Sequence, residues 1–145
     1  MREGSIAKLL RIGRCLPYIP GMNNGLAPGI VRTHSYVTTL KMRASQLKTD
    51  VFSTPGMIGL MERTCVDLTE PYLDDDEQTV GIHVDVRHLA PTKIGQSVTV
   101  IAELLEVKKN KLRYAVSATN DHGVKIGEGT HRRAVINTKH FGESA

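Results

Sequence analysis

Residues 54–68 read TPGMIGLMERTCVDL, and this stretch decides the fold. Thr54 can cap the free amides at the start of a helix, and Pro55 suits the first helical position. One apolar stripe then recurs at spacings of three and four residues, formed by Met57, Leu60, Met61, Thr64, Cys65 and Leu68. Pro71 and the acidic run at 74–77 end this pattern. The sequence therefore predicts one helix of about four turns over residues 55–69.

After this helix, the pattern changes to the two-residue period of a β-strand. Residues 80–88 alternate between apolar and polar or small side chains, which is typical of a half-buried strand. One face of this strand is predicted to carry Val80, Ile82, Val84, Val86 and His88. Further strands are expected at 97–107, 112–118 and 124–137, separated by turns at 91–95, 108–111 and 120–123. The result is an α+β fold, with one long helix against a curved antiparallel sheet.

Two glycines, Gly127 and Gly129, lie inside the last predicted strand. A glycine inside a strand marks a bulge or a close backbone approach. We expect one of these two features at each position.

The first 45 residues form a basic segment, and we expect residues 46–145 to form the folded domain. Eight of the 19 Lys and Arg residues, but only one of the 15 Asp and Glu residues, lie within residues 1–49. The isoelectric point of 9.2 therefore reflects this segment and gives no reason to expect a nucleic-acid partner. Three interpretations stay open for the segment: a mitochondrial targeting peptide, a disordered arm, or, for its later part at 32–45, a first strand of the domain.

The cysteine content indicates the compartment. Cys15 and Cys65 are too few for a disulfide framework or a cysteine-based metal site. We therefore expect a reducing compartment, either the cytoplasm or, if residues 1–40 act as a targeting peptide, the mitochondrion. No window reaches 18 consecutive apolar residues, so no membrane span is expected.

Three residues break their local pattern in a direction that suits chemistry. Glu62 borders the apolar stripe, where partial desolvation favours a general base, although an exposed helix carboxylate would also fit. His88 closes an apolar strand face, where it is either a core histidine or a catalyst. Capping alone explains Thr54, yet a helix start also presents unpaired amides that can polarise a carbonyl. No metal site is expected, because His83 and Asp85 face away from His88.

Four segments together resemble a known family. They are residues 52–62 (FSTPGMIGLME), 79–81 (TVG), 86–91 (VRHLAP) and 129–133 (GTHRR). Their sequence and spacing are similar to those of the fluoroacetyl-CoA-specific thioesterases and their hotdog-fold relatives, over residues 50–141. The resemblance implies a hotdog fold, in which the sheet wraps around the long helix. It also implies a homodimer that binds acyl-CoA at the subunit interface.

The same resemblance assigns the site residues. Thr54, Glu62 and His88 are implied as the catalytic set, and Gly81 and Arg133 as residues that line or support the substrate site. No cofactor and no metal are implied. Arg63 stands where the fluoroacetyl-specific enzyme has an aromatic residue. The reaction is therefore carried over, and the fluoroacetyl substrate is not.

Together, these observations predict an acyl-CoA thioesterase that hydrolyses its substrate to a free acid and CoA. The first alternative is a hotdog module that binds acyl-CoA without hydrolysing it, as a sensor or carrier. A hotdog dehydratase is disfavoured because Asp67 has no helical histidine partner, and a nucleic-acid binder because aromatic residues are few. The expected partners are acyl-CoA and a second copy of the chain, and assembly into tetramers stays open. Basic residues are candidates for the CoA phosphates, namely Lys93, Lys108, Lys109, Lys111 and Arg132.

Overall fold

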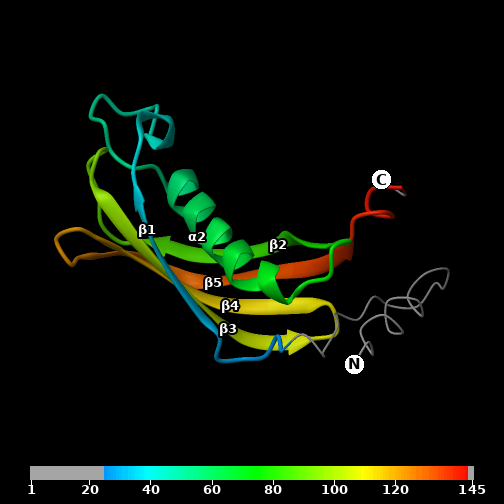
Figure 1. Ribbon diagram of the computed structural model, residues 1–145. Coiled ribbons are helices and arrows are strands. Elements are labelled where there is room, and N and C mark those ends of the chain that lie inside the picture. Colours follow the sequence, from blue (N-terminus) through cyan, green and yellow to red (C-terminus); the bar gives the residue numbers. More distant parts are fainter. Residues whose placement is uncertain (1–24, 144–145) are drawn as a thin grey trace.

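One helix lies across one face of a five-stranded sheet in the computed structural model, which describes residues 25–143 (Figure 1). The helix α2 spans Thr54–Thr69 and is followed by the short 3₁₀ turn η3, Glu70–Tyr72. A second 3₁₀ turn, η2, spans Leu40–Met42. The strands are β1 Val31–Val37, β2 Glu77–His88, β3 Ser97–Lys108, β4 Lys111–Asn120 and β5 Lys125–Asn137.

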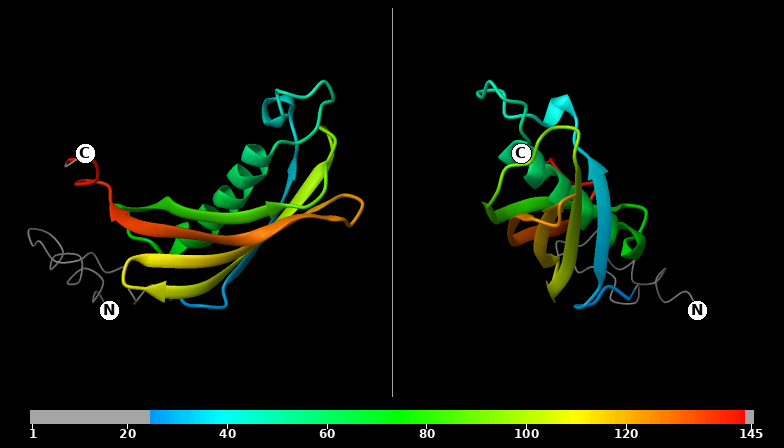
Figure 2. Two further views of the ribbon diagram at one scale, coloured as in Figure 1. Left: turned by 180° about the vertical axis from the view of Figure 1, so that it is seen from behind. Right: turned by 90° about the vertical axis from the view of Figure 1, so that its left-hand side faces the viewer.

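The sheet is antiparallel throughout and has the strand order β1-β3-β4-β5-β2. Figure 2 shows that the sheet curves and that α2 lies in its concave face. β1 and β2 are therefore the two edge strands, and β2 carries His88 at its end. No helix within residues 25–143 is long and apolar enough to cross a bilayer.

The predicted helix and the four predicted strands are confirmed. The interpretation of residues 32–45 as the source of a first strand is also confirmed, because β1 pairs with β3 and Val37 lies opposite Ser97. β1 thus joins the sheet from the N-terminal side of residue 46, where we expected the domain to begin. The targeting-peptide and disordered-arm interpretations concern mainly residues 1–24, which lie outside the described part of the chain.

α2 is fixed to the sheet by its apolar stripe. Every residue of the predicted stripe is buried, from Met57 at 0% exposure to Leu60 at 8%. The stripe packs on alternate residues of the two central strands, namely Val98, Val100, Ala102 and Leu104 of β3, and Leu112, Tyr114, Val116 and Ala118 of β4. Burial of one large apolar side chain contributes about 1.5–3 kcal/mol. Because α2 also contains the poor helix formers Gly56 and Gly59, this packing and not local propensity stabilises it.

A threonine within the stripe has its hydroxyl satisfied by hydrogen bonds. Thr64 Oγ1 donates to the Leu60 carbonyl at 2.8 Å and accepts from the Tyr36 hydroxyl of β1 at 2.9 Å. A buried hydroxyl without such partners would cost about 1–3 kcal/mol. The pair with Tyr36 therefore links α2 to the edge strand β1.

The predicted facing of β2 is wrong in its first half, because the strand contains a register shift between Gly81 and His83. Gly81 lies opposite Arg133 before the shift, and Val84 lies opposite His131 after it. One extra residue in a strand reverses which face the following side chains occupy. Val80 therefore points away from α2, whereas Gly81, Val84, Val86 and His88 share the face that the helix covers.

The expected close approaches at Gly127 and Gly129 are confirmed. A Cβ atom on Gly127 would lie 2.7 Å from Met57 Cε of α2. A Cβ atom on Gly129 would overlap the Asp85 carbonyl oxygen and lie 2.6 Å from Val86 Cα. The backbones of β2 and β5 thus approach each other too closely at Gly129 for any side chain.

Two glycine-to-alanine substitutions should have opposite effects on stability. Gly129→Ala should lower the free energy of unfolding by at least about 2 kcal/mol, because its methyl group meets rigid backbone. Gly59→Ala should raise it by about 0.5–1 kcal/mol, because Gly59 is helical and an added Cβ has no neighbour within 4 Å. Urea denaturation measures both effects. Equal stability of the two variants would contradict the close approach.

Candidate active site

The start of α2 differs from the prediction in one respect. Ser53, and not Thr54, caps the helix, because its Oγ accepts the Gly56 amide at 3.0 Å and its backbone is extended. Thr54 is the first helical residue, with Pro55 after it. The capping role therefore falls to Ser53 and leaves the Thr54 hydroxyl available for another partner.

That partner is His88, at the end of β2. Thr54 Oγ1 lies 2.8 Å from His88 Nδ1, within hydrogen-bonding distance. The His88 ring also meets the Phe52 ring edge to face, with centroids 6.5 Å apart. Two of the three predicted catalytic residues thus come together from elements far apart in the sequence.

The surroundings of His88 favour its neutral form. Burial lowers the pKa of His88 below its ordinary value, and a backbone hydrogen bond with Ala90 opposes this effect. Its Nε2 atom is buried and has no hydrogen-bond partner among residues 25–143. A neutral imidazole beside a hydroxyl is the arrangement that general-base catalysis requires.

Glu62 does not join this pair within one chain. It follows Thr54 by eight residues, which is about 12 Å along a helix axis. Its carboxylate instead lies 3.8 Å from His131 Nε2 and 4.0 Å from Arg133 Nη1, and its side chain is 40% exposed. The chain therefore holds a Thr54–His88 pair and a separate cluster around Glu62.

Gly81 and Arg133 both belong to the Glu62 cluster. A Cβ atom on Gly81 would lie 2.8 Å from Glu62 Oε1, so the missing side chain leaves room for the carboxylate. The buried Arg133 donates from Nε to Thr79 Oγ1 at 2.8 Å and from Nη2 to the Thr79 carbonyl at 2.9 Å. The register of β2 and β5 explains the meeting, because Gly81 lies directly opposite Arg133.

His131 belongs to the same cluster and was not among the predicted site residues. It is buried, its Nδ1 bonds to the His83 carbonyl at 2.9 Å, and its ring stacks on Tyr114. Its sequence signal was its place two residues before Arg133, on the same face of the strand.

A hollow of about 830 Å³ lies beside the Thr54–His88 pair. Residues of η2 and the segment after it form one side, and residues 88–91 form another. Its apolar lining includes Met42, Leu47, Phe52 and Leu89. Lys41 and Arg43 add positive charge, and Arg43 is paired with Asp50 at 3.1 Å. The hollow thus offers an apolar wall with a basic border next to the hydroxyl and the imidazole.

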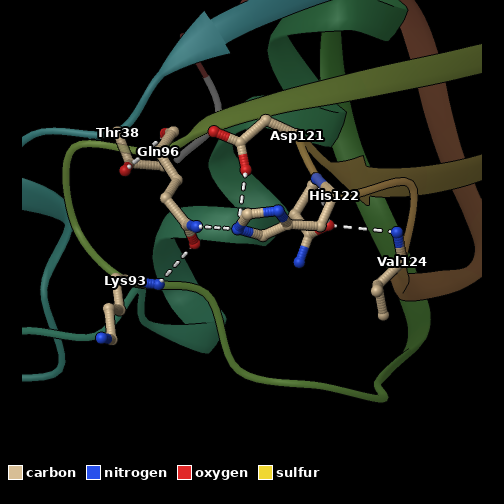
Figure 3. A network of polar contacts seen from close by, with 7 residues as sticks. Thr38, Lys93, Gln96, Asp121, His122 and Val124 are labelled. Atoms are coloured by element: carbon tan, nitrogen blue, oxygen red, sulfur yellow. Dashed lines mark hydrogen bonds and ion pairs between the residues drawn. The ribbon is translucent and has the colours of Figure 1, made fainter.

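The loop that follows His88 is held by a network of polar contacts (Figure 3). Gln96 accepts from the Lys93 amide at 3.0 Å through Oε1, and its Nε2 lies 2.8 Å from His122 Nε2. The Gln96 carbonyl also accepts from Thr38 Oγ1 at 2.9 Å. The loop between β2 and β3 is therefore tied both to the end of β1 and to the turn between β4 and β5.

Most of the basic residues considered for CoA lie away from the pair. Lys108, Lys109 and Lys111 form the hairpin between β3 and β4. Lys111 lies opposite Ala134, near one end of β5, whereas His88 lies opposite Gly127, near the other end.

Among residues 25–143, no three His, Cys, Asp or Glu side chains are grouped so that they could hold a metal ion.

Known proteins are similar to this chain in sequence and fold. A family model described as fluoroacetyl-CoA-specific thioesterase matches residues 34–139. A fluoroacetyl-CoA thioesterase from Streptantibioticus cattleyicolor is 38% identical over 129 residues, which cover 83% of this chain and 92% of that enzyme. A crystal structure of a mutant fluoroacetyl-CoA-specific thioesterase with fluoroacetate and CoA matches with a TM-score of 0.76 and 37% identity, over 80% of this chain and 99% of that one. A hot-dog-like protein from Thermanaerovibrio acidaminovorans, at 21% identity and a TM-score of 0.77 over 86% of this chain and 93% of that one, shares the fold.

The helix on its curved antiparallel sheet is thus the hotdog fold, and the predicted fold and resemblance are confirmed. Fold and helix-start site together define a member of the hotdog-fold thioesterases. Within that class, the chain belongs to the fluoroacetyl-CoA-specific thioesterase family.

Proposed function

We propose that this protein is an acyl-CoA thioesterase, which hydrolyses its substrate to a free acid and CoA. The observation that carries the proposal is the 2.8 Å contact of Thr54 Oγ1 with His88 Nδ1 at the start of α2, beside an apolar hollow. Two relatives that match most of this chain are fluoroacetyl-CoA thioesterases, which act on a CoA ester. The acyl group of this protein's own substrate is left undefined by these features.

In the proposed mechanism, the thioester carbonyl lies at the start of α2. Pro55 has no amide hydrogen, and the amides of Gly56 and Met57 bond to Ser53. The Thr54 amide is the remaining donor of the first turn. It polarises the carbonyl together with the positive end of the helix.

His88 acts as the general base in this mechanism. It takes the proton of the attacking hydroxyl, which belongs either to water or to Thr54. The new C–O bond forms, the C–S bond breaks, and the departing CoA sulfur receives the proton. If Thr54 is the nucleophile, water then hydrolyses the acyl ester on Thr54 with the same base.

We also propose that the active form is a homodimer and that the partner subunit supplies the carboxylate. β2 is an edge strand, and it exposes the apolar side chains of Ile82 by 48% and Val84 by 40%. Such an edge is suited to pairing with a second copy of itself. The separation of about 12 Å along α2 keeps Glu62 away from Thr54 of its own chain. A two-fold contact through β2 would bring the partner's Glu62 toward the pair.

Substitution of the proposed catalytic residues should abolish hydrolysis without unfolding the protein. With a panel of acyl-CoA esters from acetyl to octanoyl and fluoroacetyl, His88→Ala and Glu62→Gln should each lower kcat about 10²- to 10⁴-fold. Thr54→Val should do the same, and Thr54→Ser should keep activity if the hydroxyl is the nucleophile. Free-thiol detection measures the rates.

His140→Ala, in an exposed ring near the C-terminus, is the matched control and should keep the wild-type rate. If the wild type binds acyl-CoA but releases no thiol, the non-catalytic binding module replaces the proposed function. Unimpaired His88→Ala and Glu62→Gln variants would overturn the assigned roles.

Mixing of two inactive variants tests whether each site uses both subunits. His88→Ala and Glu62→Gln chains, unfolded and refolded together in equal amounts, should recover about a quarter of the wild-type activity, because half of the dimers then hold one intact site of two. Mixtures that stay at background would show that both residues act from the same chain. Sedimentation velocity must show a dimer in each sample, and a monomeric wild type would overturn the proposal.

We propose that the protein works in a reducing compartment, the cytoplasm or the mitochondrion. Cys65 is buried within the apolar stripe as a free thiol. A fluorescent fusion of the whole chain, compared with one that begins at residue 25 and so keeps β1, tests the two locations. Mitochondrial signal that disappears on truncation indicates a targeting peptide, and cytoplasmic signal from both indicates none. Accumulation in a secretory compartment would contradict the proposal.

A further inference from the structure

Arg133 is a buried cation whose donors are directed mainly at neutral acceptors. Its side chain is only 7% exposed. Two of its N–H groups bond to Thr79, and Nη1 bonds to His131 Nε2 at 3.1 Å. Glu62 is the anion of the cluster, yet Nη1 lies 4.0 Å from its Oε1, which is too long for a hydrogen bond. The guanidinium therefore acts on Glu62 through its charge.

The partners of His131 determine its protonation. The His83 carbonyl is only an acceptor, so Nδ1 of His131 must carry a hydrogen. The Arg133 guanidinium is only a donor, so Nε2 of His131 must be bare. His131 is therefore the neutral Nδ1–H tautomer, and its free lone pair points at Arg133.

The charges around His131 agree with this state. Burial lowers the pKa of His131, the hydrogen bond to the His83 carbonyl opposes this effect, Arg133 lowers the pKa further, and Glu62 raises it. Cys65 of α2 is neutral, because burial raises the pKa of its thiol to about 12. Burial likewise raises the pKa of Tyr114 on β4, so its phenol is neutral. The ring of His83, on β2, has the smallest effect and also lowers the pKa of His131. The two charged groups that act on His131 are thus Arg133 and Glu62.

Arginine and carboxylate groups at short range ordinarily form a two-point hydrogen-bonded pair. Such a pair would occupy the lone pairs of Glu62 that a proton acceptor needs. In this cluster, His131 accepts one of the two Nη1 hydrogens, and Thr79 accepts from Nε and Nη2. These three bonds hold the guanidinium in an orientation that leaves Glu62 Oε1 4.0 Å from Nη1. Gly81 adds to the effect, because its missing side chain leaves room for the carboxylate against β2, where a Cβ atom would lie 2.8 Å from Glu62 Oε1.

We propose that His131 is a positioning residue of the thioester-hydrolysis site, whose neutral imidazole holds Arg133 at ion-pair distance from Glu62 and so keeps the carboxylate lone pairs free for water or substrate. This inference rests on the proposed function. Protonation of His131 at acidic pH would place an N–H on Nε2, facing Arg133. Glu62 Oε1, 3.8 Å from Nε2, is an anionic acceptor for this hydrogen. The same event would therefore block the carboxylate.

Two variants of His131 separate positioning from packing. His131→Phe keeps a ring against Tyr114, where the centroids lie 6.3 Å apart in the wild type, but it removes the acceptor. His131→Gln loses the ring and keeps a neutral acceptor and donor. We expect His131→Phe to lower kcat about 10- to 100-fold with KM changed less than about threefold, as for groups that orient a reacting residue. His131→Gln should restore kcat to within about fivefold of the wild type.

The pH dependence adds a readout that packing would not change. As pH falls below the ordinary histidine value of about 6.5, the wild type should lose kcat because the general base His88 and His131 both take a proton. His131→Gln cannot take that proton, so its kcat should fall less over the same range. A kcat profile of His131→Gln identical to that of the wild type would overturn the inference.

A measurement on the wild type keeps the inference testable if His131→Phe fails to fold. The ¹⁵N chemical shifts of the His131 ring should show the Nδ1–H tautomer at pH 7.5. A cationic ring or an Nε2–H tautomer at that pH would overturn the inference. So would a wild-type kcat in folded His131→Phe, or equal losses in both variants.

The two possible failures can be told apart. If the wild type releases no thiol from any acyl-CoA, the proposed function is overturned and the inference falls with it. If the wild type is active and the His131 results go against expectation, the inference alone is overturned.

Discussion

The packing of α2 into the concave face of β3 and β4 is the constraint on which the site depends. The helix contains two glycines and a proline, so its stability comes from the buried stripe and not from its backbone preferences. Once the stripe is seated, the rotation of the helix about its axis is fixed. Thr54 must then face the end of β2, and Glu62 must face the Gly81–Arg133 pair. The positions of Thr54 and Glu62 thus follow from the apolar contacts that fix the same helix on the sheet.

The register shift in β2 is the second determinant. Without it, Gly81 and Val84 could not both face α2, because residues three apart in a regular strand point to opposite sides. With it, the strand presents a gap beside Glu62 in its first half and a histidine beside Thr54 at its end. The shift also aims the His83 carbonyl at the ring of His131, which fixes the tautomer of that ring. A single inserted residue therefore serves both halves of the site.

Much of this could be predicted from the sequence, and the exceptions have physical causes. The helix and strands follow from the periods of apolar residues, and the glycine contacts at 127 and 129 follow from glycines in a strand. The facing of Val80 was wrong because a bulge interrupts a two-residue period without changing the pattern of residue types. Ser53 and Thr54 are both good caps, and only the backbone geometry decides between them. His131 was missed because its one sequence signal, a place two residues before Arg133 on the same strand face, does not reveal its hydrogen bonds to Arg133 and the His83 carbonyl.

The hollow beside Thr54 has two walls of unequal stiffness. On one side, the amides of Leu89 and Ala90 bond to the Ile126 carbonyl of β5, and the loop beyond them is anchored through Gln96. On the other side, the backbone bonds of Leu47 and Thr49 stay within residues 44–51. Residues 44–49 can therefore move with less disturbance of the sheet than the first wall, although Asp50 and Phe52 at their far end are bonded to Ile94 and Thr92. Residues 44–49 are thus the part of the hollow's border that can be redesigned without altering β2, β5 or the Thr54–His88 contact.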